Sequence, residues 1–207
     1  SWLDPHKIAE SIRDDTRLVS VMLVNNEIGV IQSIKEIAKI CHLRGVLLHC
    51  DATQAVGRIP VDVSDFDVDL LSFSGHKIYG PRGIGALVVR RRRPRIKLTP
   101  LLEGGGQEQG RRSGTLNVPA VIGLAKGLQL CHDELEVEAD RIARLRQTLF
   151  DRVTSELDDV GLNGPDFSLR VPGNLSLHFG KVDGEALMMN MGPVAVSSGS
   201  ACTSANP

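Results

Sequence analysis

The stretch SFSGHKIYGPRG, residues 72–83, decides the fold, because it is a polar turn with three glycines between two apolar runs. The run DLLSF (69–73) leads into it and the run IGALVVR (84–90) follows it. Short apolar runs bounded by turn residues are typical of buried strands. The turn carries a histidine next to a lysine, His76 and Lys77. A lysine at the end of a buried strand is either solvated or used chemically.

Upstream of this turn, helix and strand patterns alternate. Asp4 and Pro5 suit the N-cap and first position of a helix, while Ser33 and Glu36 form the S-x-x-E pattern of a capping box. Gly45 suits the end of that second helix. We therefore expect an α/β fold with a mostly parallel sheet and flanking helices. The expected elements are a helix over 5–13, a strand over 18–24, a helix between 33 and 45, and a strand over 46–50.

Downstream, the segment 118–157 is dense in leucine, glutamate, arginine and alanine, which predicts one long helix or two in series. The expected organisation is a partial large domain over 1–117, a long connecting helix over 118–160, and part of a smaller α+β domain over 161–207. In that last part we expect loops at GLNG (161–164) and RVPGN (170–174), strands at NLSLHF (174–179) and VAVSS (194–198), and a helix at EALMMNM (185–191).

Composition limits the class of protein. The chain has 207 residues, 42% of them hydrophobic, and a formal net charge of −1, so it can bury a substantial core. It has no apolar run near the roughly 18 residues that span a bilayer and no signal-peptide pattern at its start, so we expect a soluble, cytoplasmic protein without a membrane partner. The cysteines show no close pairing and are expected to be free thiols: Cys41, Cys50, Cys131 and Cys202.

Polar residues follow four of the apolar runs. In an open parallel sheet, ligands bind at the carboxyl ends of the strands, so these residues are candidates for a binding site. The four segments are 25–27, 51–54, 74–77 and 199–202.

Within these segments, two side chains match the needs of pyridoxal 5'-phosphate. This cofactor requires a lysine for its Schiff base and an acidic partner for its ring nitrogen, which Lys77 and Asp51 can supply. Ser74 and His76 offer donors for its phosphate. Taken alone, Lys77 would be a solvated lysine and Asp51 a helix N-cap. The set of four favours the cofactor.

Several multi-residue motifs, in order through the chain, resemble the cysteine desulfurases of the NifS and IscS type. These are aminotransferase class V-like enzymes of the fold-type I pyridoxal-phosphate group. The resemblance implies conversion of L-cysteine to L-alanine, with the sulfur held as a persulfide and passed to an acceptor, either an iron–sulfur scaffold or a thiolation carrier. The motifs are HCDATQAVG (49–57), SFSGHKIYGPRGIGAL (72–87), GGGQEQGRRSGT (104–115) and SSGSACTS (197–204).

The resemblance also implies a role for each matched residue. Lys77 and His76 would belong to the catalytic set, with Lys77 holding the cofactor, and the thiolate of Cys202 would attack the substrate sulfur. The remaining implied contacts are Asp51 with the pyridinium nitrogen, Gln54 with the ring hydroxyl, Asn26 near that hydroxyl and the substrate carboxylate, Ser74 and His76 with the phosphate, and Thr115 with the phosphate of the other subunit in a homodimer.

The surroundings of the cysteines fit these assignments. The sequence around Cys202 is small, polar and glycine-containing, which is typical of a mobile loop that exposes a nucleophilic thiol. The alternative, a buried core cysteine, fits Cys41 and Cys50 better because their neighbours are apolar. A complete family member also has upstream and downstream parts that are not present in this sequence, so we expect the chain to be a fragment.

Other interpretations remain open. The basic run RRRRPRIK (90–97) is typical either of nucleic-acid binding or of a solvated face, and the near-neutral net charge favours the solvated face. Neighbouring histidine and cysteine pairs such as His49 and Cys50 point to opposite faces of a strand, so we expect no metal site. Two alternative functions are a selenocysteine lyase or aminotransferase-like enzyme, and a non-catalytic binding or dimer-forming module.

Overall fold

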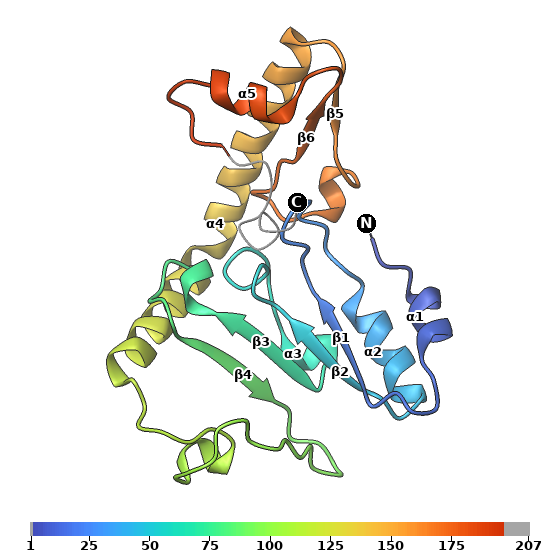
Figure 1. Cartoon of the computed structure of the whole chain (residues 1–207), viewed down its shortest axis with the longest axis vertical. Helices are drawn as coiled ribbons and strands as arrows, with labels where there is room; N and C mark the ends of the chain where they lie inside the picture. The colour runs from blue at the N-terminus through green and yellow to red at the C-terminus, as the bar shows by residue number, and fades with distance from the viewer. Residues whose placement is uncertain (1, 197–207) are drawn as a thin grey trace. The chain divides into compact units, whose positions relative to one another are not determined.

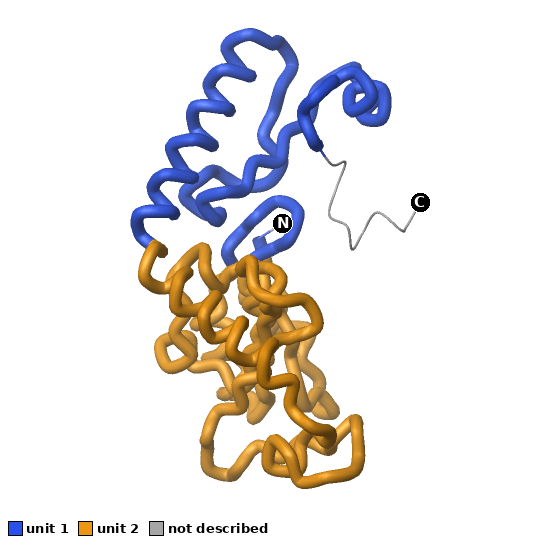
Figure 2. The backbone as a smooth tube through the Cα atoms, turned by 90° about the vertical axis from the view of Figure 1, so that its left-hand side faces the viewer, with its two compact units in different colours: residues 1–2, 24–31, 136–207 blue, residues 3–23, 32–135 orange. Residues whose placement is uncertain are grey.

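The computed structural model describes residues 2–196, and two compact units are distinguished within the chain (Figure 2). Unit 1 consists of Ser1–Trp2, Val24–Ile31 and Glu136–Pro207. Unit 2 consists of Leu3–Leu23 and Gln32–Leu135. Three of the four polar strand-end segments fall within the described residues: 51–54 and 74–77 belong to unit 2, and 25–27 belongs to unit 1.

Unit 2 is built on a four-stranded sheet of order β1-β2-β3-β4 (Figure 1). β1, β2 and β3 run parallel, and β4 is antiparallel to β3. The turn between β3 and β4 is too short for the crossover that a parallel pair requires, so the last strand reverses. The predicted α/β fold with a mostly parallel sheet is confirmed. The strands are β1 (Leu18–Met22), β2 (Leu47–Asp51), β3 (Leu70–Ser74) and β4 (Gly85–Val89).

Three helices precede or connect these strands: α1 (Pro5–Ser11), α2 (Ile34–Leu43) and α3 (Val63–Phe66). Asp4 caps α1 as predicted, since its Oδ1 accepts a hydrogen bond from the backbone N–H of His6 at 2.9 Å. The predicted capping box at Ser33 and Glu36 is wrong. Ser33 has φ −75° and ψ 60°, not the extended backbone of a capping serine, and its hydroxyl makes no cap hydrogen bond to the described helix.

The core of unit 2 lies between α2 and one face of the sheet. Ile37 and Cys41 of α2 are fully buried, as are Leu48 and Cys50 of β2. Side chains alternate along a strand, so His49 and Asp51 lie on the opposite, half-exposed face of β2. The pattern of burial therefore separates an apolar face that stabilises the fold from a more open face that carries polar groups.

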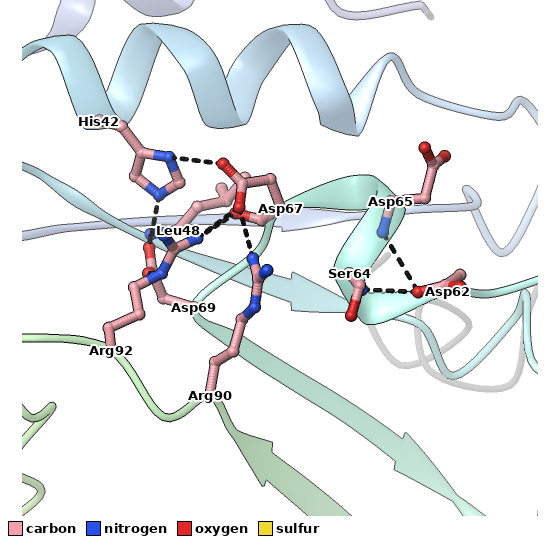
Figure 3. A network of polar contacts seen from close by, with 9 residues as sticks. All are labelled: His42, Leu48, Asp62, Ser64, Asp65, Asp67, Asp69, Arg90 and Arg92. Atoms are coloured by element: carbon pink, nitrogen blue, oxygen red, sulfur yellow. Dashed lines mark hydrogen bonds and ion pairs between the residues drawn. The ribbon is translucent and has the colours of Figure 1, made fainter.

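A buried carboxylate organises the amino end of β3 (Figure 3). The side chain of Asp69 is fully buried. Its Oδ2 accepts hydrogen bonds from the backbone N–H of Leu48 at 2.8 Å and lies 2.9 Å from Nε2 of His42 on α2. Its other oxygen forms an ion pair with Nε of Arg92. Because these partners come from α2, β2 and the segment after β4, Asp69 ties three parts of unit 2 together.

The same network explains part of the basic run. Arg90 and Arg92 both pair with Asp67 (Figure 3). Burial raises the pKa of Asp67, but the hydrogen bonds and charges of the two arginines outweigh this and hold it below its usual value. The other basic side chains of the run, Arg91, Arg93, Arg95 and Lys97, are exposed. In this run, Arg90 and Arg92 therefore stabilise the fold, and the remaining basic side chains face solvent.

Helix α4 (Val118–Glu156) is a single helix of 39 residues in the segment where one helix or two were predicted. Its residues up to Leu135 belong to unit 2 and the remainder to unit 1. Ala120 and Leu124 are its buried residues among those described. No described helix is both long and apolar enough to cross a membrane.

Unit 1 contains a two-stranded antiparallel sheet, β5 (Val160–Leu162) with β6 (Leu177–Phe179), followed by α5 (Gly184–Asn190). The prediction of a loop at 161–164 is wrong in its first half, since Gly161 and Leu162 lie in β5. The pairing of Leu162 with Leu177 overrides the local turn signal. Of the strand predicted over 194–198, the described residues 194–196 lie outside any strand, and the others are outside the described residues.

Candidate active site

The carboxyl ends of β2 and β3 bring the predicted polar residues to one edge of the sheet. Asp51 ends β2 and Ser74 ends β3. In the parallel register, Asp51 lies opposite Ser72, and the backbone N–H of Ala52 donates to the carbonyl of Ser72 at 2.8 Å. The carboxylate of Asp51 accepts a hydrogen bond from the backbone N–H of Thr53 at 2.9 Å, which holds the chain in a turn as it leaves the strand.

Lys77 lies in a tight turn that immediately follows β3. Residues Gly75–Lys77 form a short 3-10 helix, η1, and the carbonyl of Gly75 accepts from the N–H groups of Ile78 and Gly80 at 3.1 and 2.9 Å. Gly75 is buried, and a Cβ there would lie 3.1 Å from the carbonyl oxygen of Pro81. A side chain at this position would have to displace its neighbours slightly, so the close packing of the turn favours glycine at its start. It holds His76 exposed and Lys77 half-buried beside the strand end.

Ser74 and His76 form the closest side-chain pair at this edge. Oγ of Ser74 lies 2.7 Å from Nδ1 of His76. The contact uses one proton, from either the hydroxyl or Nδ1, so at least one of the two side chains keeps a proton that it can donate to an anionic oxygen. Asp51, Ser74, His76 and Lys77 are called the strand-end cluster below.

The remaining predicted residues lie in different surroundings. Gln54 lies in the turn after β2, and its Oε1 accepts from the guanidinium of Arg58 at 3.1 Å. Thr115 is exposed in the segment between η2 (Gln107–Gly110) and α4. Asn26 belongs to unit 1 and lies in a turn, and Cys202 lies outside the described residues. The roles of all these residues stay predictions.

The three described cysteines are free, as predicted. Burial and, to a lesser degree, the charge of Asp69 raise the pKa of Cys41 to about 11. Burial and the charge of Asp51 raise the pKa of Cys50 to about 12, although its hydrogen bond with the Leu23 backbone acts in the opposite direction. Burial also raises the pKa of Cys131. None of the three has the lowered pKa of a nucleophilic thiol.

One polar row was missed by the sequence interpretation. The imidazole of His49 lies between two hydroxyls, with Nδ1 2.8 Å from Oγ of Ser20 and Nε2 3.0 Å from Oγ of Ser72. The row therefore crosses β1, β2 and β3 on the same face as Asp51. The alternation of side chains along a strand could have revealed this row from the sequence, because it places His49 and Asp51 on the same face of β2.

The strand-end cluster fits the chemistry of pyridoxal 5'-phosphate. Two neighbouring strand ends supply a carboxylate, a paired hydroxyl and imidazole, and a lysine, which are the groups that this cofactor needs for its ring nitrogen, phosphate and aldehyde. In the part of the chain that the structure describes, no three histidine, cysteine or acidic side chains form a group that could hold a metal ion.

Comparison with known proteins identifies the class to which this fold and cluster belong. The family model for aminotransferase class-V matches residues 2–207, so the chain belongs to the aminotransferase class-V family, whose members depend on pyridoxal 5'-phosphate. Within it, the chain is 52% identical over 204 residues to the cysteine desulfurase IscS of Ehrlichia chaffeensis, covering 99% of this chain and 50% of that protein. The predicted resemblance to the NifS and IscS type is confirmed.

Solved structures give the same result. DndA from Streptomyces lividans matches with a TM-score of 0.80 and 39% identity over 91% of this chain and 52% of that one. A structure of SspA in complex with cysteine matches with a TM-score of 0.79 and 31% identity over 98% of this chain and 55% of that one. The chain thus spans about half the length of the relatives that it matches.

Proposed function

We propose that this chain is part of a pyridoxal-phosphate-dependent cysteine desulfurase that converts L-cysteine to L-alanine and retains the sulfur as a persulfide. The observation that carries the proposal is the strand-end cluster, which combines a lysine, a carboxylate and a hydroxyl–imidazole pair. The 52% sequence identity to a curated cysteine desulfurase supports it. The cysteine complex of the structural relative SspA supports L-cysteine as the substrate.

In this proposal, Lys77 holds the cofactor covalently and Asp51 pairs with the protonated ring nitrogen. Ser74 and His76 donate to the phosphate. Bound in this way, the cofactor supplies an electron sink that activates the bonds around the substrate's amino-bearing carbon. The 3-10 turn contributes by fixing Lys77 directly after His76 and three residues after Ser74, so that both ends of one small cofactor can be held at a single strand end.

The sulfur-transfer step assigns the nucleophile to Cys202. Its thiolate attacks the sulfur of the substrate, so a sulfur–sulfur bond forms as the carbon–sulfur bond of the substrate breaks. The electron pair of the broken bond remains on the substrate carbon, which takes up a proton and leaves as alanine. The raised pKa values of Cys41 and Cys50 support this choice, because a thiol that stays protonated cannot act as the nucleophile.

The organisation of the whole protein is part of the same proposal. We infer a homodimer in which Thr115 contacts the phosphate bound by the other subunit, and a cytoplasmic location in which the free thiols stay reduced. The persulfide sulfur would pass to an iron–sulfur scaffold or a thiolation carrier. Residues 1–117, 118–160 and 161–207 are assigned to a large domain, a connecting helix and a small domain.

The proposal is tested by following alanine and sulfide from L-cysteine with the purified protein in the presence of pyridoxal 5'-phosphate and a thiol reductant. We expect Cys202→Ser to lose at least roughly a hundredfold in sulfide release, as is usual when a covalent nucleophile is removed. Cys131→Ser is the matched control and should retain release. Full sulfide release by Cys202→Ser would contradict the role of Cys202 and favour a lyase reaction that needs no such thiol, as in the selenocysteine lyase alternative. Formation of a keto acid in place of alanine would instead indicate an aminotransferase-like reaction.

A further inference from the structure

A single amide side chain in unit 1 connects the turn that holds Asn26 to a buried arginine. Nδ2 of Asn174 donates a hydrogen bond to the backbone carbonyl of Glu27 at 2.8 Å. Oδ1 of the same Asn174 accepts from the guanidinium of Arg170 at 3.1 Å. Both ends of the Asn174 amide are therefore occupied, one by the turn 25–29 and the other by Arg170.

Arg170 is a rigid anchor for this connection. Only 3% of its surface is exposed. Its Nε donates to the carbonyl of Pro165 at 3.0 Å and another guanidinium nitrogen donates to the carbonyl of Asn163 at 2.6 Å. A buried arginine whose planar fork is held by several acceptors loses little freedom when it makes one more hydrogen bond. Arg170 can therefore orient the amide of Asn174.

Helix α4 holds the same segment from a second direction. The guanidinium of Arg146 lies 4.1 Å from the ring centroid of Phe167 and donates to the carbonyl of Val171 at 3.2 Å. The ring of Phe150, also on α4, contacts Phe167 edge-on at a centroid distance of 5.1 Å. The residues on both sides of Arg170 are thus fixed to the helix.

Asn174 and the backbone N–H of Val171, which donates to the carbonyl of Gly29 at 3.0 Å, set the position of the turn 25–29 rather than its shape. Its shape comes from Asn25, whose Oδ1 accepts from the N–H groups of Glu27 and Ile28 at 2.9 Å each. Gly29 closes the turn with φ +67°, and a Cβ at Gly29 would lie only 2.4 Å from Cβ of Asn174. This close approach and the bond to Glu27 place the turn directly against Asn174.

We propose that Arg170 and Asn174 are positioning residues that hold Asn26 in place for its role in the reaction. Asn26 lies between Asn25, which shapes the turn, and Glu27, whose carbonyl Asn174 holds. Loss of the Asn174 donor weakens the attachment of the turn to this segment, so the turn opens more often and Asn26 is held less firmly. The inference rests on the proposed function through the role at the cofactor and substrate that the family resemblance implies for Asn26.

The substitution Asn174→Asp tests the proposal, because it keeps an acceptor for Arg170 and removes the donor to Glu27. We expect amide hydrogen exchange in a peptide covering 25–29 to become roughly tenfold faster, which corresponds to the loss of about one hydrogen bond. The thermal midpoint should fall by only a few degrees, as expected for the loss of one hydrogen bond. Asn190→Asp, an exposed asparagine of α5 in the same unit, is the matched control and should leave exchange at 25–29 unaltered.

A second readout connects the turn to the reaction. Asn174→Asp should lower kcat/KM for L-cysteine by a factor similar to that of Asn26→Ala, and the double variant should lose no more than either single variant. Unchanged exchange at 25–29 in Asn174→Asp, or fully additive losses in the double variant, would overturn the proposal. Because exchange needs no turnover, an inactive protein would count against the proposed function while the positioning of the turn would still be tested.

Discussion

Oγ of Ser74 and Nδ1 of His76 lie 2.7 Å apart at the point where β3 enters the turn that carries Lys77. The two side chains come from residues only two apart in sequence, and the intervening Gly75 is held by backbone hydrogen bonds to Ile84 and Gly80. In the proposed site, both groups are therefore held in a fixed arrangement before the cofactor binds. Such preorganisation lowers the entropic cost of binding a phosphate.

Ser74→Ala should weaken pyridoxal 5'-phosphate binding. The variant removes one donor to the phosphate and also the group that orients His76, so we expect the Kd to rise by at least roughly tenfold, the effect of one hydrogen bond to a charged group. Titration of the cofactor followed by its absorbance measures the Kd. Ser155→Ala on the exposed side of α4 is the control. An unchanged Kd in Ser74→Ala would remove Ser74 from the phosphate site.

Asp69→Asn should destabilise unit 2 strongly. Asp69 is fully buried and joins His42, Arg92 and the backbone of Leu48, so loss of its charge leaves Arg92 without its buried partner. We expect the free energy of unfolding in urea to fall by about 3 kcal/mol. Asp65→Asn removes a carboxylate that pairs with Lys35 on the surface, and should cost less than about 1 kcal/mol. Similar losses for both variants would show that the network in Figure 3 contributes no more than a surface ion pair.

The cysteines should differ in their reaction with iodoacetamide at pH 8. The thiolate is the reactive form, and pKa values of about 11 for Cys41 and about 12 for Cys50 leave almost none of it at this pH. We expect both to be alkylated at least roughly tenfold more slowly in the folded protein than in urea, where the usual thiol pKa returns. Cys202 should react first. Mass spectrometry of timed samples gives the rates, and rapid labelling of Cys50 in the folded protein would contradict its assignment to the core.

Much of the sheet could be predicted from local patterns, because apolar runs of four to seven residues with polar ends are characteristic of buried strands. The rule that ligands bind at the carboxyl ends of parallel strands then placed Asp51 and Ser74 at one edge. The prediction failed where local signals compete with pairing. Gly161 is a residue type typical of turns, but it lies in β5 and pairs with His178 of β6. Ser33 is a residue type typical of N-caps, but its backbone does not have the extended conformation of a capping serine.

The bracing of the turn 25–29 could not be predicted for a different reason. Asn174 and Glu27 are 147 residues apart in sequence, so no local period or motif connects them. The contact depends on α4 holding the segment around Phe167, which is a property of the packed unit. The row of His49 with Ser20 and Ser72 would have been easier to predict from the sequence, since alternation along β2 already places His49 on the face of Asp51.

The central claim, that Lys77 holds pyridoxal 5'-phosphate at the strand-end cluster, is tested most directly by borohydride reduction. The protein is incubated with the cofactor and reduced, which fixes the cofactor to the lysine that binds it, and the labelled peptide is then identified by mass spectrometry. The account predicts stoichiometric label on Lys77 and its absence in Lys77→Ala. Label on a different lysine, or label spread evenly over the surface lysines, would contradict it.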